Sequence, residues 1–108
     1  LLTDLPIMLP YRNPANYSGF HLYPIQLTAD SGKTRKQVFD SLRAQNIGVN
    51  VHYIPVHTQP YYAKLGFKQG DFPHAERYYA QAISLPLYYD LSEASQAQVV
   101  DAIYQALA

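Results

Sequence analysis

Prolines set the main limits on where this chain can form regular structure. The sequence of 108 residues contains eight prolines, and each lacks the amide hydrogen that helix interiors and central strands need. Three of them fall within residues 1–18, together with Asn and Ser turn formers. This composition predicts a linker or an extended segment over residues 1–18. We therefore expect the folded domain to comprise residues 19–108.

The first half of that domain carries one strand signal and one helix signal. Residues Phe20–Leu27 alternate between two faces, which predicts a strand, and Pro24 places it at a sheet edge because it cannot donate to a ladder. Thr34 and Gln37 have the spacing of a capping box at the start of a helix expected over Thr34–Asn46. The apolar stripe of that helix is expected to be Val38, Phe39 and Leu42.

The second half predicts a strand, a loop, a helix, a short strand and a final helix. The strand is expected over Val49–Ile54, ended by Pro55, and the loop over Val56–Gly70, with at most a helical turn at Tyr61–Leu65. The next helix is expected over Pro73–Ile83, with Ala75, Tyr79, Ala82 and Ile83 facing inward. The short strand is expected over Leu85–Tyr89, and the final helix over Glu93–Leu107, capped by Ser92. This order predicts an α/β (α+β) two-layer sandwich in which helices cover a short sheet.

Composition excludes several classes of function. The chain has no cysteine, which rules out disulfides and cysteine zinc sites, and its formal net charge is zero with no long basic cluster. We therefore expect neither nucleic-acid nor anionic-membrane partners. No apolar run approaches the roughly 20 residues of a membrane span, and no basic leader precedes one, so the expected location is cytoplasmic.

Two further features indicate that some surface faces something other than water. Charged residues make up 15% of the chain, whereas about 25% is typical of a soluble domain. The 11 tyrosines supply large rings that are intermediate in burial. Because the chain also begins without Met, we interpret it as a fragment of a longer protein.

The four histidines are the main candidates for chemistry. None has the paired spacing of a zinc helix, so no metal site is predicted. His52 and His57 flank the end of the second predicted strand, although spacing alone favours ordinary hydrogen-bonded histidines. We also expect neither histidine to have a neighbouring carboxylate that would tune it as a base. The surrounding VNVHYIPVHTQPYY segment is nevertheless the most function-like part of the chain, because loops after strands often carry sites.

At this segment the sequence resembles a known family. The blocks are HLYPIQL, RKQVFDSLRAQNIGVNVHYIPVHTQPYYAKLGF and GDFPHAERYYAQAISLPLYYDLSEASQAQVV, from about His21 to Ile103. They resemble the C-terminal part of the nucleotide-sugar aminotransferases of the DegT/DnrJ/EryC1/StrS family. The nearest members by this resemblance aminate C4 of a UDP-linked 4-keto-6-deoxy hexosamine on the pseudaminic acid route.

The resemblance implies that the complete protein is a fold type I pyridoxal 5'-phosphate (PLP) enzyme. Residues 1–18 would then be a linker from a missing large domain, and residues 19–108 the smaller C-terminal domain. The cofactor and its Schiff-base lysine would belong to the large domain. This chain would therefore contain no catalytic residue and would be inactive alone.

The resemblance also implies a binding segment and partners. The residues implied to bind substrate are His52, Tyr53, Ile54, Pro55 and His57. His21 is implied to lie at the domain junction. The implied partners are a UDP-sugar, an amino donor such as glutamate, the protein's own large domain, and a second copy in a homodimer.

Two alternatives remain open from the sequence. One is a dehydratase relative in which histidine replaces the cofactor lysine of the large domain. The other is a sugar-nucleotide-binding or protein-binding module without chemistry of its own.

Overall fold

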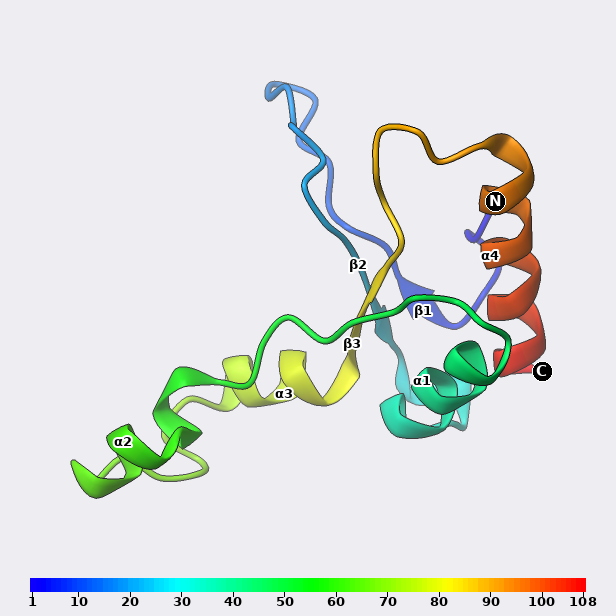
Figure 1. Ribbon diagram of the computed structural model, residues 1–108. Helices are drawn as coiled ribbons and strands as arrows, with labels where there is room; N and C mark the ends of the chain where they lie inside the picture. The colour runs from blue at the N-terminus through cyan, green and yellow to red at the C-terminus, as the bar shows by residue number, and fades with distance from the viewer.

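A three-stranded antiparallel sheet organises the fold (Figure 1). The computed structural model describes all residues, 1–108. The strands are β1 (Ile7–Met8), β2 (Tyr23–Leu27) and β3 (Ala82–Leu85), in the order β1-β2-β3. The helices are α1 (Arg35–Ala44), α2 (Pro60–Lys64), α3 (Pro73–Gln81) and α4 (Glu93–Leu107), with 3-10 turns at Ala29–Ser31 and Val56–Thr58. The small α+β architecture predicted from the sequence is confirmed.

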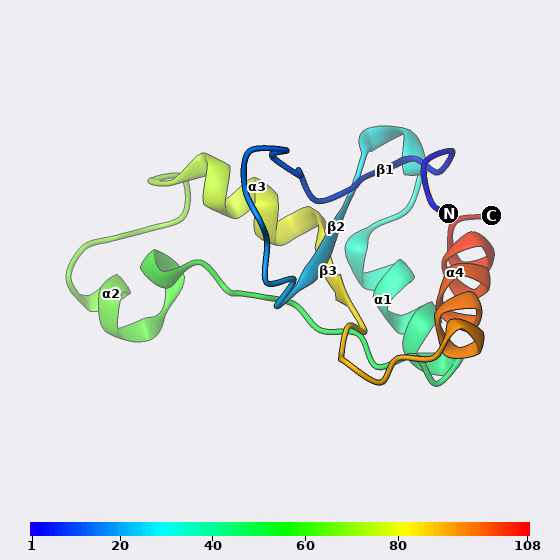
Figure 2. The same cartoon turned by 90° about the horizontal axis from the view of Figure 1, so that it is seen from above.

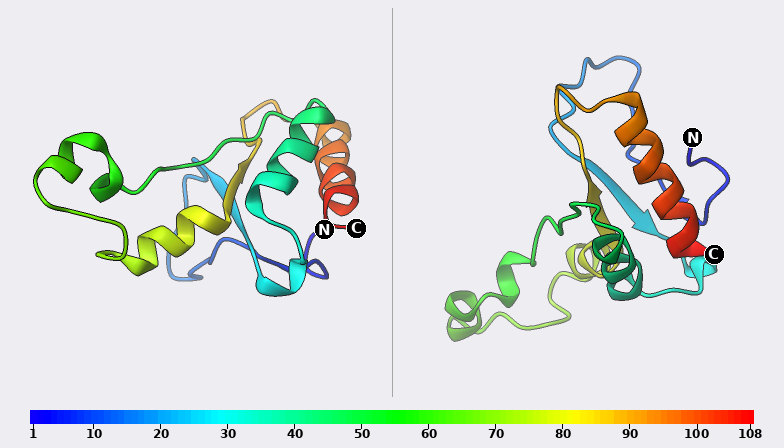
Figure 3. Two further views of the ribbon diagram at one scale, coloured as in Figure 1. Left: turned by 90° about the horizontal axis from the view of Figure 1, so that it is seen from below. Right: turned by 45° about the vertical axis from the view of Figure 1, so that its right-hand side comes forward.

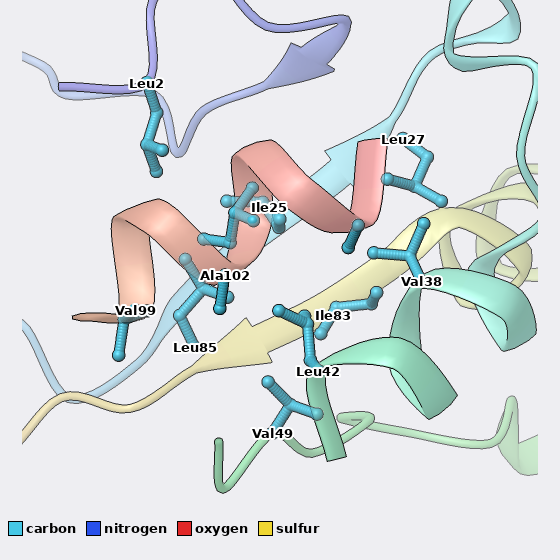
Figure 4. Close-up of a cluster of buried hydrophobic side chains, with 12 residues drawn as sticks. Leu2, Ile25, Leu27, Val38, Leu42, Val49, Ile83, Leu85, Val99 and Ala102 are labelled. Atoms are coloured by element: carbon cyan, nitrogen blue, oxygen red, sulfur yellow. The ribbon is translucent and has the colours of Figure 1, made fainter. Parts of the chain in front are cut away.

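The core lies between one face of the sheet and helices α1 and α4, which pack side by side (Figures 2 and 4). Ile25 of β2 pairs with Ile83 of β3, and both side chains are fully buried. Val38 and Leu42 lie one turn apart on α1 and cover them. The twelve buried side chains of the core are Leu2, Ile25, Leu27, Val38, Leu42, Val49, Ile83, Leu85, Val99, Ala102, Ile103 and Ala106.

The helix starts follow the sequence signals. Thr34 caps α1 and forms the predicted capping box with Gln37, whose backbone N–H donates to the Thr34 hydroxyl. Ser92 caps α4 in the same way through Ser95. Asn46, which follows α1, has a positive φ of 63°, a conformation that asparagine tolerates better than most residues.

Strand β2 is central in the sheet, so the prediction that Pro24 marks an edge strand was wrong. Pro24 lies opposite Ser84, whose backbone N–H and C=O both bond Asn50 on the far side of β3. The pair therefore exchanges no hydrogen bond, and the Pro24 nitrogen faces the β1 side. There β1 ends at Met8, opposite Gln26. A proline is tolerated because no neighbour requires its missing N–H.

The predicted second strand, Val49–Ile54, does not form. Only an isolated bridge joins Asn50 to Ser84. In an antiparallel register the next hydrogen-bonded pair would join His52 to Ala82. Residues after His52 would need partners within α3, because β3 begins directly where α3 ends. A helix offers no ladder, so the chain leaves the sheet.

The third helix ends earlier than predicted, and the strand that follows it also starts earlier. Ala82 and Ile83, predicted on the inward face of the helix, lie in β3, where pairing with β2 overrides helix periodicity. Ala75, also predicted to face inward, is exposed. The expected strand Leu85–Tyr89 is wrong beyond its first residue, because Pro86 ends the pairing.

Part of residues 1–18 packs on the domain. Leu2 is buried in the core, and β1 extends the sheet. The Tyr104 hydroxyl of α4 donates to the Asp4 carboxylate and contacts the Leu1 carbonyl oxygen at 3.3 Å. These contacts show that the first residues are more than a connector, while the domain boundary at residue 19 stays a prediction.

The molecule is more extended than its mass requires. Its radius of gyration is 15.5 Å, whereas about 13 Å is expected for a compact domain of this length. Its accessible surface is 7833 Å², against roughly 6,100 Å² for a compact monomer of this mass. Much of the difference lies in residues 56–72, called the arm below, which project with α2 away from the core (Figures 1 and 3).

None of the helices combines the length and the apolar character needed to cross a membrane.

We predict that the Tyr104–Asp4 contact makes the packing of the first residues dependent on pH. The Tyr104 hydroxyl lowers the pKa of Asp4 below its ordinary value of 3.8, and the Asp4 carboxylate raises the pKa of Tyr104 above 10.0. The contact therefore stabilises the fold at neutral pH. Its contribution is lost as the pH falls through the lowered pKa of Asp4, and again as the pH rises through the raised pKa of Tyr104.

An NMR titration of the Asp4 carboxyl in Tyr104→Phe checks this prediction. The pKa should return toward 3.8, because the phenyl ring donates no hydrogen bond. Tyr17→Phe is the control, since that ring is fully exposed and the tyrosine that bonds Asp4 is Tyr104. An Asp4 pKa that is the same in Tyr104→Phe and the parent chain would contradict the prediction.

We also predict that the chain expressed alone self-associates. Large apolar side chains such as Leu65 (61% exposed) and Val56 (61% exposed) lie on its surface, and few charges oppose contact between copies. Sedimentation velocity over a concentration series should show species heavier than a monomer, together with binding of a hydrophobic dye. Leu65→Ser should reduce both. A monomer at high concentration that binds no dye would refute the expectation.

Candidate functional site

The segment 52–57 begins where the chain leaves the sheet. Asn50 and Ser84 exchange two backbone hydrogen bonds, of 3.1 and 2.8 Å. Two residues further on, Nδ1 of His52 lies 2.8 Å from the Oγ of Ser84, which is buried. Strand β3 therefore holds the start of the segment through both its backbone and a side chain.

The other end of the segment is held by α3. His57 is only 6% exposed, and its Nε2 lies 2.7 Å from Oε1 of Glu76. The backbone N–H of Gly70 donates to the same oxygen at 2.7 Å. The Phe72 ring packs against the imidazole with 4.8 Å between ring centres. These contacts close the base of the arm onto α3.

The Glu76 carboxylate is adapted to this role. The Gly70 N–H, and after it the hydrogen bond with His57, lower the pKa of Glu76 below its ordinary value of 4.5. Hydrogen bonds donated to a carboxylate stabilise its charged form. Glu76 is therefore ionised at neutral pH and accepts from both partners.

Between these two anchors the chain presents side chains to solvent. Tyr53 is 71% exposed and Ile54 is 50% exposed. The Tyr53 ring meets the His52 ring edge-on, with centres 4.6 Å apart. Pro55 is buried, and its carbonyl accepts a hydrogen bond of 2.7 Å from the Thr58 hydroxyl. Rings and aliphatic groups so arranged can pack on a flat ligand, and an imidazole edge can bond a hydroxyl.

The structure divides the sequence-predicted site residues into two groups. His52, Tyr53 and Ile54 are at least partly accessible, whereas Pro55 and His57 are buried. The expectation that neither histidine has a carboxylate neighbour was wrong for His57, because the α3 helix brings Glu76 to it. His21 lies in the exposed connection before β2.

Two supporting residues, Glu76 and Ser84, were not predicted. Glu76 lies in the GDFPHAE block, in the first turn of α3. An acidic residue at that place is common because it interacts favourably with the helix dipole, so it gave no signal of a further role. Ser84 is the one polar residue in the buried strand AISL. A hydroxyl in such a strand was the available signal, since a buried polar group needs a partner.

The described residues do not fit a cofactor or metal site. All four lysines, Lys33, Lys36, Lys64 and Lys68, are exposed on helices or loops. A lysine that forms a Schiff base needs a desolvated setting that lowers its pKa. No group of three or more His, Asp and Glu side chains gathers in an arrangement that could hold a metal ion.

Two hollows in the surface lie away from the segment 52–57. One, of about 310 Å³, is apolar and lies between the end of β3, the first residues and α4. Another is enclosed by the exposed connection between β1 and β2. Neither is lined by a residue of the segment 52–57. Tyr53 and Ile54 of the segment form an exposed surface strip.

Comparison with known proteins places this chain among aminotransferases. The DegT/DnrJ/EryC1/StrS aminotransferase family model matches residues 1–104. The spore coat polysaccharide biosynthesis protein SpsC of Bacillus subtilis is 38% identical over 100 residues, which are 90% of this chain and 26% of that protein.

Solved structures agree with the sequence comparison. The structure of S. venezuelae DesV in complex with a ketimine intermediate matches with a TM-score of 0.84 at 31% identity, over 97% of this chain and 28% of that chain. PseC of Helicobacter pylori, an aminotransferase involved in the biosynthesis of pseudoaminic acid, matches with a TM-score of 0.81 at 27% identity, over 98% of this chain and 29% of that chain.

The chain spans about a quarter of the length of these relatives. The match to the family nevertheless covers nearly all of its own residues. This chain belongs to the DegT/DnrJ/EryC1/StrS aminotransferase family.

Proposed function

We propose that this chain is the small C-terminal domain of a sugar aminotransferase, joined through residues 1–18 to a large domain that binds PLP. The observation that carries the proposal is the exposed Tyr53–Ile54 strip, anchored at both ends in a chain of this family. The proposed reaction moves an amino group, with glutamate as donor, to a UDP-linked 4-keto-6-deoxy sugar. Its proposed setting is a homodimer.

The exposure of the lysines in this chain suggests which domain binds the cofactor and which binds the substrate. PLP supplies the electron sink that amino-group transfer requires. With every lysine of this chain exposed, we assign the cofactor and its lysine to the large domain. The small domain then contributes binding and orientation, and the chain alone transfers no amino group.

Within the strip we assign three residues to direct contact with the sugar nucleotide. Tyr53 and Ile54 are exposed and would pack on the ligand. His52, with Nδ1 engaged by Ser84, would direct the rest of its ring outward to bond a hydroxyl. Pro55 and His57 are buried and would support these contacts from beneath. His21 is proposed to lie at the domain junction.

The substrate class is supported by the relatives. PseC is involved in the biosynthesis of pseudoaminic acid, and SpsC in that of a spore coat polysaccharide. Both processes build sugars, which supports a sugar as the substrate of this chain's full-length protein. We propose the UDP-linked 4-keto-6-deoxy hexosamine as substrate because the sequence blocks resemble the pseudaminic acid branch of the family.

The full-length protein, purified with PLP, tests the proposed function. Incubation with glutamate and a UDP-4-keto-6-deoxy hexosamine should yield 2-oxoglutarate and the 4-amino sugar, measured by mass spectrometry. Residues 1–108 alone should yield neither, and borohydride should not fix PLP to any of their lysines. Release of water from the sugar without amino transfer would replace this proposal with a dehydratase, and binding without any turnover with a binding module.

We predict that Tyr53→Ala in the full-length enzyme raises KM for the sugar nucleotide and spares kcat. A contact made equally in the ground and transition states affects only binding. The loss should be about 1 to 3 kcal/mol, or a rise in KM of roughly 5- to 150-fold. Tyr89→Ala is the control, because that ring is fully exposed and lies outside the strip. Loss of turnover with KM unchanged would show that Tyr53 acts in the chemistry instead.

A further inference from the structure

Both anchors of the segment 52–57 belong to one continuous piece of the chain. Ser84, which holds His52, is in β3, and Glu76, which holds His57, is in α3. Helix α3 ends at Gln81 and β3 begins at Ala82, so no loop separates the two anchors. The distance between them is therefore fixed by regular structure.

We infer that Glu76 and Ser84 are positioning residues, which clamp the two ends of the segment and so fix how Tyr53 and Ile54 meet a sugar nucleotide. This inference rests on the proposed function. Neither residue needs to touch the substrate. Each acts through the histidine that it holds.

Glu76 is the more informative of the two, because it also tethers the arm. One oxygen, Oε1, bonds His57 near the start of the arm and Gly70 near its end. Every other hydrogen bond of residues 56–70 has its partner within residues 55–71. In Glu76→Ala the arm would lose its side-chain hydrogen bonds to α3 and keep the backbone bond from the Glu76 N–H to the Phe72 carbonyl.

The aromatic contacts of the arm join its own residues and are mostly exposed. The rings of His57, Phe72, Phe67 and Tyr62 form a chain of neighbours, with centres 4.8 to 6.3 Å apart. Phe72 and Phe67 are 47% and 40% exposed. Such rings can slide against one another, whereas the two hydrogen bonds to Glu76 define a direction. The carboxylate therefore sets the orientation that the rings alone would leave free.

Loss of Glu76 should leave the core intact. No residue of the arm or of α3 belongs to the core cluster, which lies between the sheet and helices α1 and α4. The side chain of Glu76 itself is 20% exposed. Local opening of the arm can thus be separated from global unfolding, since segments with few buried contacts open independently.

The test compares Glu76→Ala, Glu76→Gln and a control in the full-length protein. Glu76→Gln keeps an oxygen that can accept from Gly70, so it should recover much of what Glu76→Ala loses. Asp40→Ala removes the carboxylate of an exposed ion pair with Lys36 on α1, and serves as the matched control. Hydrogen exchange followed by mass spectrometry and steady-state kinetics are measured on all three variants.

In Glu76→Ala, peptides from residues 56–72 should exchange at least about tenfold faster, while peptides from α1 and α4 stay protected. KM for the sugar nucleotide should rise about tenfold, with kcat within about a factor of two of the parent enzyme. Ser84→Ala should raise KM without faster exchange in the arm, because it releases only His52. Asp40→Ala should change neither quantity.

Three results would overturn the inference. Unchanged exchange of residues 56–72 in Glu76→Ala would show that the carboxylate does not hold the arm. Faster exchange with an unchanged KM would show that the arm does not position the substrate. An equal rise in exchange and in KM in Glu76→Gln and Glu76→Ala would show that the oxygen shared by His57 and Gly70 does not hold the arm. A parent enzyme without amino transfer would instead contradict the proposed function, and the exchange data would still decide whether Glu76 holds the arm.

Discussion

The pairing of β3 on both of its edges is the interaction on which the rest of the structure depends. On one edge β3 pairs with β2 and brings Ile83 against Ile25 in the core. On the other edge Ser84 bonds Asn50, so the same strand determines where the segment 52–57 starts. All four residues of β3 are buried. A strand this short can serve both purposes because alternate residues face opposite edges and faces of the sheet.

Signals that depend on neighbouring residues were read correctly from the sequence. The capping box of Thr34 and Gln37 and the cap at Ser92 fix helix starts through contacts within three residues. Strand positions were read less well, because a strand is defined by its partner. Val49–Ile54 has a strand composition but meets the end of α3 instead of a ladder, and Ile83 has a place in a helical pattern but pairs with Ile25.

The candidate site shows the same division. The segment 52–57 could be found because its residues are consecutive and its block resembles a family. The residues that hold it could not, because Glu76 and Ser84 approach only through the path of α3 and β3. The sequence therefore pointed to the segment, whereas the three-dimensional structure was needed to learn that His57 is buried and that the Glu76 carboxylate accompanies it.

The separation of the core from the arm has a consequence for how this domain can evolve. Stability resides in twelve buried side chains between the sheet, α1 and α4. The exposed strip of Tyr53 and Ile54 and the residues that hold it, Glu76 and Ser84, lie outside that cluster. If Tyr53 and Ile54 contact a ligand as proposed, they can vary with its shape while Glu76 and Ser84 stay fixed. Ligand specificity would then change through residues 53 and 54. The hydrogen-bonded His52 and His57 would keep the backbone between them in place whichever side chains stand at those two positions.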